Sequence, residues 1–145
     1  MAENPFIGAW ALVSYEFRDG QGEAIYPFGR EPQGYILYTA EGLMSVAFMP
    51  QGRANFQAAD LRGGTAAEKA GAYDSFFAYS GRYEIRGEVV VHHAEISLFP
   101  NWSNSGQERF YQFEGERLIL SSAPVAYEGV QRTARLVWQR VQSGE

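Results

Sequence analysis

The sequence predicts an all-β fold: an antiparallel up-and-down barrel of eight strands, and up to ten. Short apolar or alternating runs recur along the 145 residues, and aromatic residues, which are favoured in strands, make up 15% of the chain. Most of the runs are separated by a residue followed by glycine, which supplies the positive φ of tight hairpin turns. These pairs are Asp19-Gly20, Glu41-Gly42, Arg86-Gly87, Glu114-Gly115 and Glu128-Gly129. Eight tilted strands close into a barrel that holds packed side chains or one small ligand.

We expect one domain over residues 1–145, with a single short helix between the third and fourth strands. The expected strands cover residues 8–18, 34–39, 43–49, 80–86, 88–98, 107–113, 116–122 and 131–141. Thr65 and Glu68 have the spacing of a capping box. Apolar residues then recur at helical spacing, which predicts a helix over residues 66–79. This helix would plug or cover one barrel mouth, with Tyr73, Phe76 and Phe77 packed in the core or acting as a lid.

Composition excludes several classes of function. The net charge is −5 and the 12 basic residues form no cluster, so nucleic acid is not expected as a partner. The chain has no cysteine, and His92 and His93 are adjacent on a strand and face opposite sides. We therefore expect no metal site and no cofactor. No secretory signal and no apolar run of about 18 residues is visible, which predicts a cytoplasmic protein that does not insert into membranes.

The first strand opens with Gly8-Ala9-Trp10, which resembles the Gly-x-Trp signature of lipocalins and related calycin barrels. In that group the tryptophan closes the barrel floor and an arginine of the last strand packs across it, so the resemblance implies these roles here. In a closed antiparallel barrel the start of the first strand lies beside the end of the last. The matching arginine is therefore Arg140 rather than Arg135.

Further segments, in order along the chain, are similar to the lipocalin-like domain proteins of bacteria and fungi. They include Pro27-Phe28-Gly29, Tyr79-Ser80-Gly81-Arg82-Tyr83, Val91-His92-His93, Pro100-Asn101-Trp102 and Gln107-Glu108-Arg109. The resemblance implies the fold but no particular activity, because most members have none assigned. The family often has glycine soon after Pro-Asn-Trp, whereas here it comes later, at Gly106.

Strand alternation indicates which side chains line the interior. One face of residues 107–113 carries Gln107, Arg109 and Tyr111, His92 shares a face with Val90, and Ser14 shares one with Trp10 and Leu12. A few polar groups in an apolar cavity are typical of small-molecule sites. The candidate ligand-binding residues are Ser14, Tyr38, Tyr83, His92, Trp102, Gln107, Arg109 and Tyr111, with Trp102 at the rim.

Arg109 and His92 allow more than one interpretation. A buried guanidinium requires a partner, which is either a carboxylate or enolate of the ligand or a carboxylate of the protein itself. His92 is either a neutral side chain hydrogen-bonded to a Tyr or Gln, or a group that contacts the ligand or transfers a proton.

Three functions follow. The first is the binding of a small, largely hydrophobic molecule. The second is an isomerase or cyclase in which His92 is the acid or base and Arg109 stabilises an anion, so whether the protein is an enzyme stays open. The third is a module without a ligand that uses an outer patch of Val13, Tyr15 and Phe17. Outward aromatic residues such as Tyr15 and Phe17 also suggest a homodimer.

Overall fold

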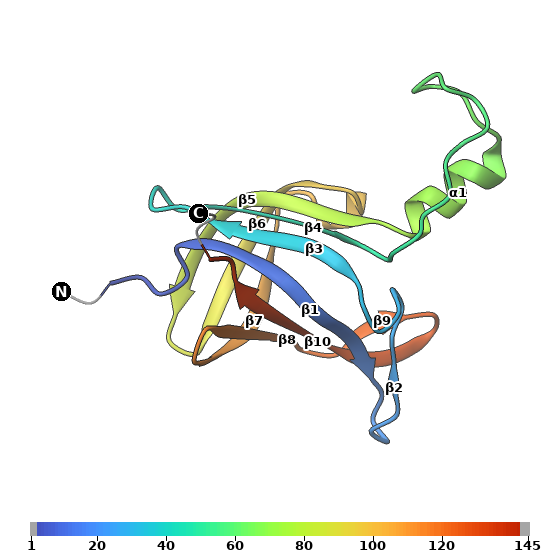
Figure 1. The fold of residues 1–145 in the computed structure, drawn as a ribbon. Helices are drawn as coiled ribbons and strands as arrows, with labels where there is room; N and C mark the ends of the chain where they lie inside the picture. The colour runs from blue at the N-terminus through green and yellow to red at the C-terminus, as the bar shows by residue number, and fades with distance from the viewer. Residues whose placement is uncertain (1–2, 143–145) are drawn as a thin grey trace.

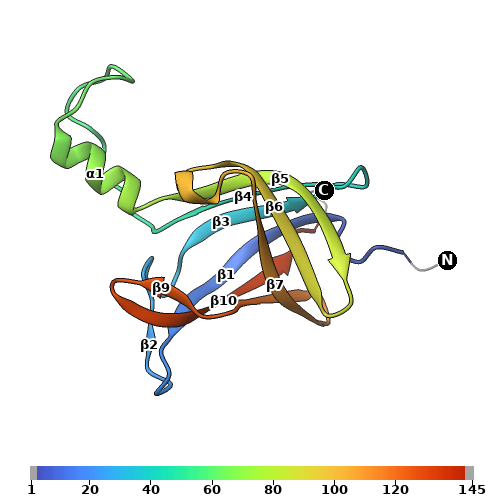
Figure 2. The same ribbon diagram turned by 180° about the vertical axis from the view of Figure 1, so that it is seen from behind.

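In the computed structural model, which describes residues 3–142, eight main strands form a closed antiparallel barrel (Figures 1 and 2). Strands that follow one another in the chain pair with one another, and β1 closes the barrel by pairing with β10. This confirms the predicted all-β, up-and-down architecture. The eight strands are β1 (Gly8–Arg18), β3 (Gln33–Tyr38), β4 (Leu43–Met49), β5 (Phe77–Arg86), β6 (Val89–Ser97), β7 (Ser105–Glu114), β8 (Arg117–Ser122) and β10 (Val130–Arg140).

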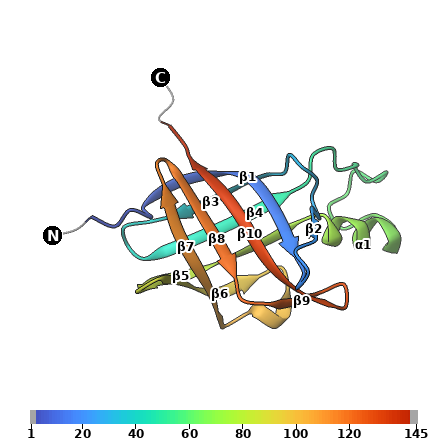
Figure 3. The ribbon, with the colours of Figure 1, turned by 90° about the horizontal axis from the view of Figure 1, so that it is seen from below.

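Two short strands extend the sheet and distinguish the two ends of the barrel. β2 (Ala24–Ile25) pairs with the last residues of β1, and β9 (Val125–Tyr127) pairs with the first residues of β10. Both lie at the end from which the helix α1 leaves the barrel, as Figure 3 shows. The 3₁₀ turn η1 (Pro100–Trp102) follows β6 at the same end. We call this the open end and the opposite one the closed end.

The closed end is sealed by a residue that precedes the first strand. Phe6 is fully buried, and its ring makes edge contacts with Tyr38, Tyr111 and Phe113 at centroid distances of 5.1, 4.9 and 5.0 Å. Such aromatic pairs each add about 0.5–1.5 kcal/mol beyond the area they bury. The floor of the barrel is therefore filled, and any space for a ligand lies nearer the open end.

Trp10 and Arg140 hold this floor in place, as the sequence predicts. The Trp10 indole Nε1 donates to the Phe6 carbonyl at 2.9 Å. The Arg140 guanidinium lies 4.1 Å from the centre of the Trp10 ring and donates to the carbonyls of Pro5 and Ile7. Cation–π and hydrogen-bond contacts thus tie the start of β1 to the end of β10.

A bulge in β1 reverses the alternation that the sequence suggested. Leu12 pairs with Trp138 but Ser14 pairs with Val137, so one extra residue stands opposite β10. Because an extra residue moves every later side chain to the other face, Tyr15 and Phe17 turn toward the core and Ser14 turns outward. The expected inward position of Ser14 is therefore wrong, and so is the expected outer patch that included Tyr15 and Phe17.

The helix is shorter than expected and does not cover the barrel mouth. The capping box of Thr65 and Glu68 is present, but α1 (Ala66–Asp74) ends before Phe77, which begins β5 and pairs with Phe48. No residue of α1 is buried, and Tyr73 is 45% exposed. Figures 1 and 2 show the helix projecting away from the open end. The expected extent to residue 79 and the expected plug are both wrong, because residues 77–82 pair with β4 as part of strand β5.

Candidate functional site

The candidate site is the open half of the barrel interior, which is lined by aromatic rings from many strands. Tyr15 lies at its centre, with ring centroids 5.3 Å from Phe28 and 5.0 Å from Phe48. Phe17 stacks on Tyr127 of β9 at 4.5 Å. Nearer η1, Trp102 makes edge contacts with Phe77, Tyr79 and Phe99. The wall of this half is therefore apolar and aromatic, as small-molecule sites usually are.

The interior beside β7 is accessible. Five side chains of this strand share the face that packs toward the core, and all five are half-buried. Inward residues of the neighbouring β6, such as Val90 and His92, are 0% exposed. The inward side chains of β7 are thus more exposed to solvent than those of β6. The five residues are Ser105, Gln107, Arg109, Tyr111 and Phe113.

His92 is enclosed between two tyrosines at the middle of the barrel. Its Nε2 lies 2.8 Å from the Tyr38 hydroxyl, and its Nδ1 lies 2.7 Å from the Tyr79 hydroxyl. A neutral imidazole donates through one ring nitrogen and accepts through the other, so one hydroxyl accepts from the ring and the other donates to it. Both nitrogens are therefore occupied by the protein itself, which agrees with the interpretation of His92 as a neutral, hydrogen-bonded residue.

The protonation of His92 makes it unsuitable as an acid–base catalyst near neutral pH. Burial, with smaller contributions from the positive charges of Arg109 and His93, lowers the pKa of His92 from 6.5 to about 3. A general acid or base works best when its pKa lies near the operating pH. The geometry therefore does not support the isomerase alternative, in which this ring would exchange protons with a substrate.

The same pKa predicts how stability depends on pH. His92 is neutral when folded but protonates near pH 6.5 when unfolded, so the unfolded state gains protons first as the pH falls. The contribution of neutral His92 to the free energy of unfolding is thus fully present above about pH 6.5, and it is lost as the pH falls toward 3. Between pH 7 and pH 5 we expect it to account for about 2 kcal/mol of lost stability. Urea unfolding of wild type and His92→Gln at both pH values checks this, and an equal loss in the two proteins would contradict it.

Arg109 carries an unneutralised positive charge at the edge of the aromatic interior. Its guanidinium carbon lies 5.5 Å from the centre of the Trp102 ring, and Nη1 donates to the Glu108 carbonyl at 2.9 Å. Among residues 3–142, no Asp or Glu forms an ion pair with it. The internal carboxylate that the sequence left open as its partner is therefore not found in this part of the chain.

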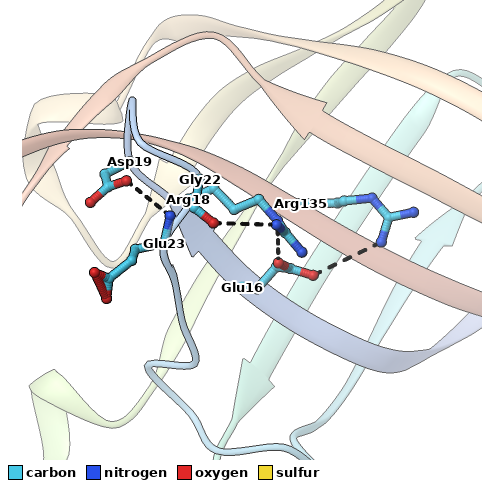
Figure 4. A network of polar contacts seen from close by, with 6 residues as sticks. All are labelled: Glu16, Arg18, Asp19, Gly22, Glu23 and Arg135. Atoms are coloured by element: carbon cyan, nitrogen blue, oxygen red, sulfur yellow. Dashed lines mark hydrogen bonds and ion pairs between the residues drawn. The ribbon is translucent and has the colours of Figure 1, made fainter.

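The buried acid of the barrel does not neutralise Arg109, because it faces outward. Glu16 is 6% exposed, and its carboxylate pairs with Arg18 at 2.7 Å and with Arg135 at 4.0 Å (Figure 4). Glu16 follows Tyr15 beyond the bulge and pairs across the strands with Arg135, on the outer side of the sheet. Within the described residues, no buried acid therefore faces the positive charge of Arg109.

Besides Arg109, the interior contains a buried hydrogen-bond donor, the indole of Trp138, that has no acceptor in residues 3–142. Its side chain belongs to the core and is 1% exposed, yet its Nε1 has no hydrogen-bond partner within the described chain. A buried donor without an acceptor costs about 1–3 kcal/mol. Its ring centroid lies 6.4 Å from that of Phe48, on the opposite wall. The aromatic interior therefore has a free indole donor besides the guanidinium.

Comparison with known proteins places the chain in a family. The sequence model of the family described as the lipocalin-like domain matches residues 7–141. The chain belongs to this family. A similar protein is the 4′-hydroxy-3′-methoxypropiophenone carrier protein of Aspergillus oryzae, which is 30% identical in a match that covers 68% of this chain and 96% of the relative. No solved structure gives a significant match.

The residues that the sequence singled out fall into three groups in this lipocalin-like barrel. Near the closed end, the Tyr83 hydroxyl donates to the Thr39 carbonyl and the Tyr111 hydroxyl donates to the Gly87 carbonyl. In the middle, Tyr38 and His92 contact each other. Trp102, Gln107 and Arg109 lie toward the open end, where Gln107 Nε2 donates to the Ser105 hydroxyl at 2.8 Å. Ser14 belongs to none of these groups, and a ligand-binding role for the others stays a prediction.

Sequence reasoning missed three residues of the site. Tyr15 was placed outside because the bulge in β1 has no recognisable signal in the sequence. Tyr79 follows the alternation of its strand with Tyr83, and this pattern could have revealed it. Trp138 shares a face with Leu136 in the sequence pattern, but its unpaired Nε1 becomes evident only when the neighbouring strands are in place.

Two hollows open on the surface of the lipocalin-like domain outside the barrel. One, of about 510 Å³, is lined by residues 27–31 with Pro50 and Gln51, and the other, of about 610 Å³, lies between residues 53–57 and α1. Phe28 lines the first hollow, and its ring also contacts Tyr15 and Phe48 inside the barrel. Over residues 3–142, no helix is long and apolar enough to cross a membrane, and no cluster of three His, Cys, Asp or Glu could hold a metal ion.

Proposed function

We propose that this protein binds and carries a small, largely hydrophobic molecule in the open half of its barrel, with Arg109 contacting the polar end of the molecule. The observation that supports this most strongly is the accessible inner face of β7, where a guanidinium without a carboxylate partner lies among aromatic rings. Arg109 is half-buried, and a molecule that covered it would have to pair its charge, because burying an unpaired charge is costly. A bound molecule with a polar end provides that pairing, and the rings provide the apolar contact.

The family relationship adds chemical detail to this proposal. The relative in Aspergillus oryzae is named as a carrier of an aromatic ketone with a hydroxyl and a methoxy group. Flat aromatic molecules pack well against tyrosine, phenylalanine and tryptophan rings, which form the wall here. Phe28 lines the surface hollow and also contacts Tyr15, so this hollow is the entry that we propose for the ligand.

The absence of cysteine from the sequence fits a reducing compartment, and we propose the cytoplasm. A homodimer is not part of this proposal, since the aromatic residues that suggested it, Tyr15 and Phe17, pack toward the barrel core.

Titration with 4′-hydroxy-3′-methoxypropiophenone tests the proposed function. Quenching of tryptophan fluorescence, confirmed by calorimetry, is expected to saturate at one molecule per chain with a dissociation constant of about 1–10 μM. Arg109→Met keeps the length of the side chain but removes the charge, and we expect binding about tenfold weaker or worse, since a charged hydrogen bond contributes roughly 1.5–3 kcal/mol.

Arg62→Met is the matched control, because Arg62 is an exposed residue of the loop before α1. It should bind like wild type. A folded wild-type protein that saturates with neither this ketone nor any of a panel of hydrophobic molecules would overturn the proposed function.

A further inference from the structure

The barrel interior has an excess of positive charge. Arg109 on β7 has no carboxylate partner in residues 3–142, and Glu16, the buried acid, is neutralised by arginines on the outer side of the sheet. A ligand without charge would leave this guanidinium in an aromatic surrounding with no counter-ion. A ligand with an anionic oxygen would neutralise it and accept from its free N–H groups.

The groups around Arg109 do not supply the missing negative charge. Its field reaches titratable side chains of four strands, namely Tyr15 of β1, Tyr38 of β3, Tyr79 of β5 and His92 of β6. Burial raises the pKa of each of the three tyrosines, and Arg109 offsets this only in part. Burial lowers the pKa of His92. All four are therefore neutral near pH 7, and η1 contributes only the uncharged ring of Trp102.

An unpaired hydrogen-bond donor in the interior also favours a ligand that can accept hydrogen bonds. Trp138 Nε1 is buried and unpaired, and an indole can only donate. Trp138 lies on β10 and Arg109 on β7, and both strands pair with β8, where Trp138 stands opposite Leu118 and Arg109 stands four residues further along, opposite Ser122. The barrel interior therefore offers an unpaired indole donor in addition to the guanidinium.

We propose that the molecule carried in the barrel is an aromatic weak acid, bound as its anion with the anionic oxygen against Arg109. This inference rests on the proposed carrier function and narrows its ligand class from hydrophobic molecules in general to phenols and related acids. The barrel then selects the ionised form of its ligand. The ligand releases its proton to water when it binds below its own pKa, and it takes a proton up again on release.

A pair of ligands that differ in one methyl group tests this inference. 4′-Hydroxy-3′-methoxypropiophenone can lose its phenolic proton, whereas 3′,4′-dimethoxypropiophenone cannot. We expect the phenol to bind at least about tenfold more tightly than its methyl ether, since the charged contact with Arg109 is lost in the ether. At one pH unit below the pKa of the free phenol, the bound phenol should show the long-wavelength absorbance of the phenolate.

Arg109→Gln should remove this absorbance change and the preference for the phenol, while Arg62→Gln should keep both. Trp138→Phe retains the ring and deletes the free donor, and it should weaken the binding of both compounds without abolishing the absorbance change. Equal binding of the phenol and the ether, with no phenolate absorbance, would overturn this inference while leaving the carrier function intact. Binding of neither compound to the folded protein, nor of any other aromatic acid or neutral hydrophobic molecule in the panel, would overturn both.

Discussion

Replacing His92 with alanine is expected to lower the free energy of unfolding by about 4 kcal/mol at pH 7. The substitution leaves the buried hydroxyls of Tyr38 and Tyr79 without their shared partner, and each lost contact costs roughly 1–3 kcal/mol. It also opens a cavity at a position that is 0% exposed. Urea unfolding followed by fluorescence measures the change.

The neighbouring histidine provides a matched control. The side chain of His93 is 39% exposed and pairs with Glu84 on the outer surface. We expect His93→Ala to cost less than about 1 kcal/mol, because exposed polar contacts contribute little. Similar losses for the two alanine variants would show that His92 is not the buried centre of the hydrogen-bond network described here.

Gly81→Ala is expected to cost about 3 kcal/mol or more, because two strands approach each other closely at this glycine. A Cβ at Gly81 would clash with the His93 carbonyl oxygen and lie 2.9 Å from the Glu95 nitrogen. These are backbone atoms of β6, so they cannot move aside as a flexible side chain would. The pairing of β5 with β6 also shifts register between Ser80 and Gly81. Thermal and urea unfolding measure the loss.

Gly20→Ala is the control for this prediction. A Cβ at Gly20 meets no atom within 4 Å, and its φ lies outside the left-handed region. We expect a change within about 0.5 kcal/mol. If Gly81→Ala were as mild as Gly20→Ala, β6 could not lie where the register places it, and the position of His92 beside Tyr79 would also be in question.

The barrel could be predicted from the sequence because the signals for its strands and turns are local. Glycine after a polar residue marks the hairpins, and alternation marks the strands between them, so all eight main strands were expected near their observed positions. The contact between Trp10 and Arg140 also followed, since closure of an antiparallel barrel brings the first and last strands together. The same alternation correctly predicted that the side chains of His92 and Tyr111 face the interior.

The errors arose where one residue changes the pattern or where contacts are distant in sequence. A single bulged residue in β1 moved Ser14 outward and Tyr15 inward. The helical spacing of Phe77 was overridden by its pairing with Phe48, since packing within a sheet outweighs weak helical preference. The enclosure of His92 by Tyr38 and Tyr79 depends on partners 54 and 13 residues away. Alternation could orient these side chains, but it could not show that they contact one another.

Native mass spectrometry of the protein purified from its own host tests the central claim most directly. We predict that wild type carries a small molecule in a ratio of one to one, and that Arg109→Met, purified in the same way, loses most of it while Arg62→Met retains it. Adding the hydroxy-methoxy ketone to stripped wild type should restore a bound species. A wild-type spectrum with no bound molecule, unchanged by an excess of the ketone or of any of the panel of hydrophobic molecules, would contradict the claim that the barrel is a carrier.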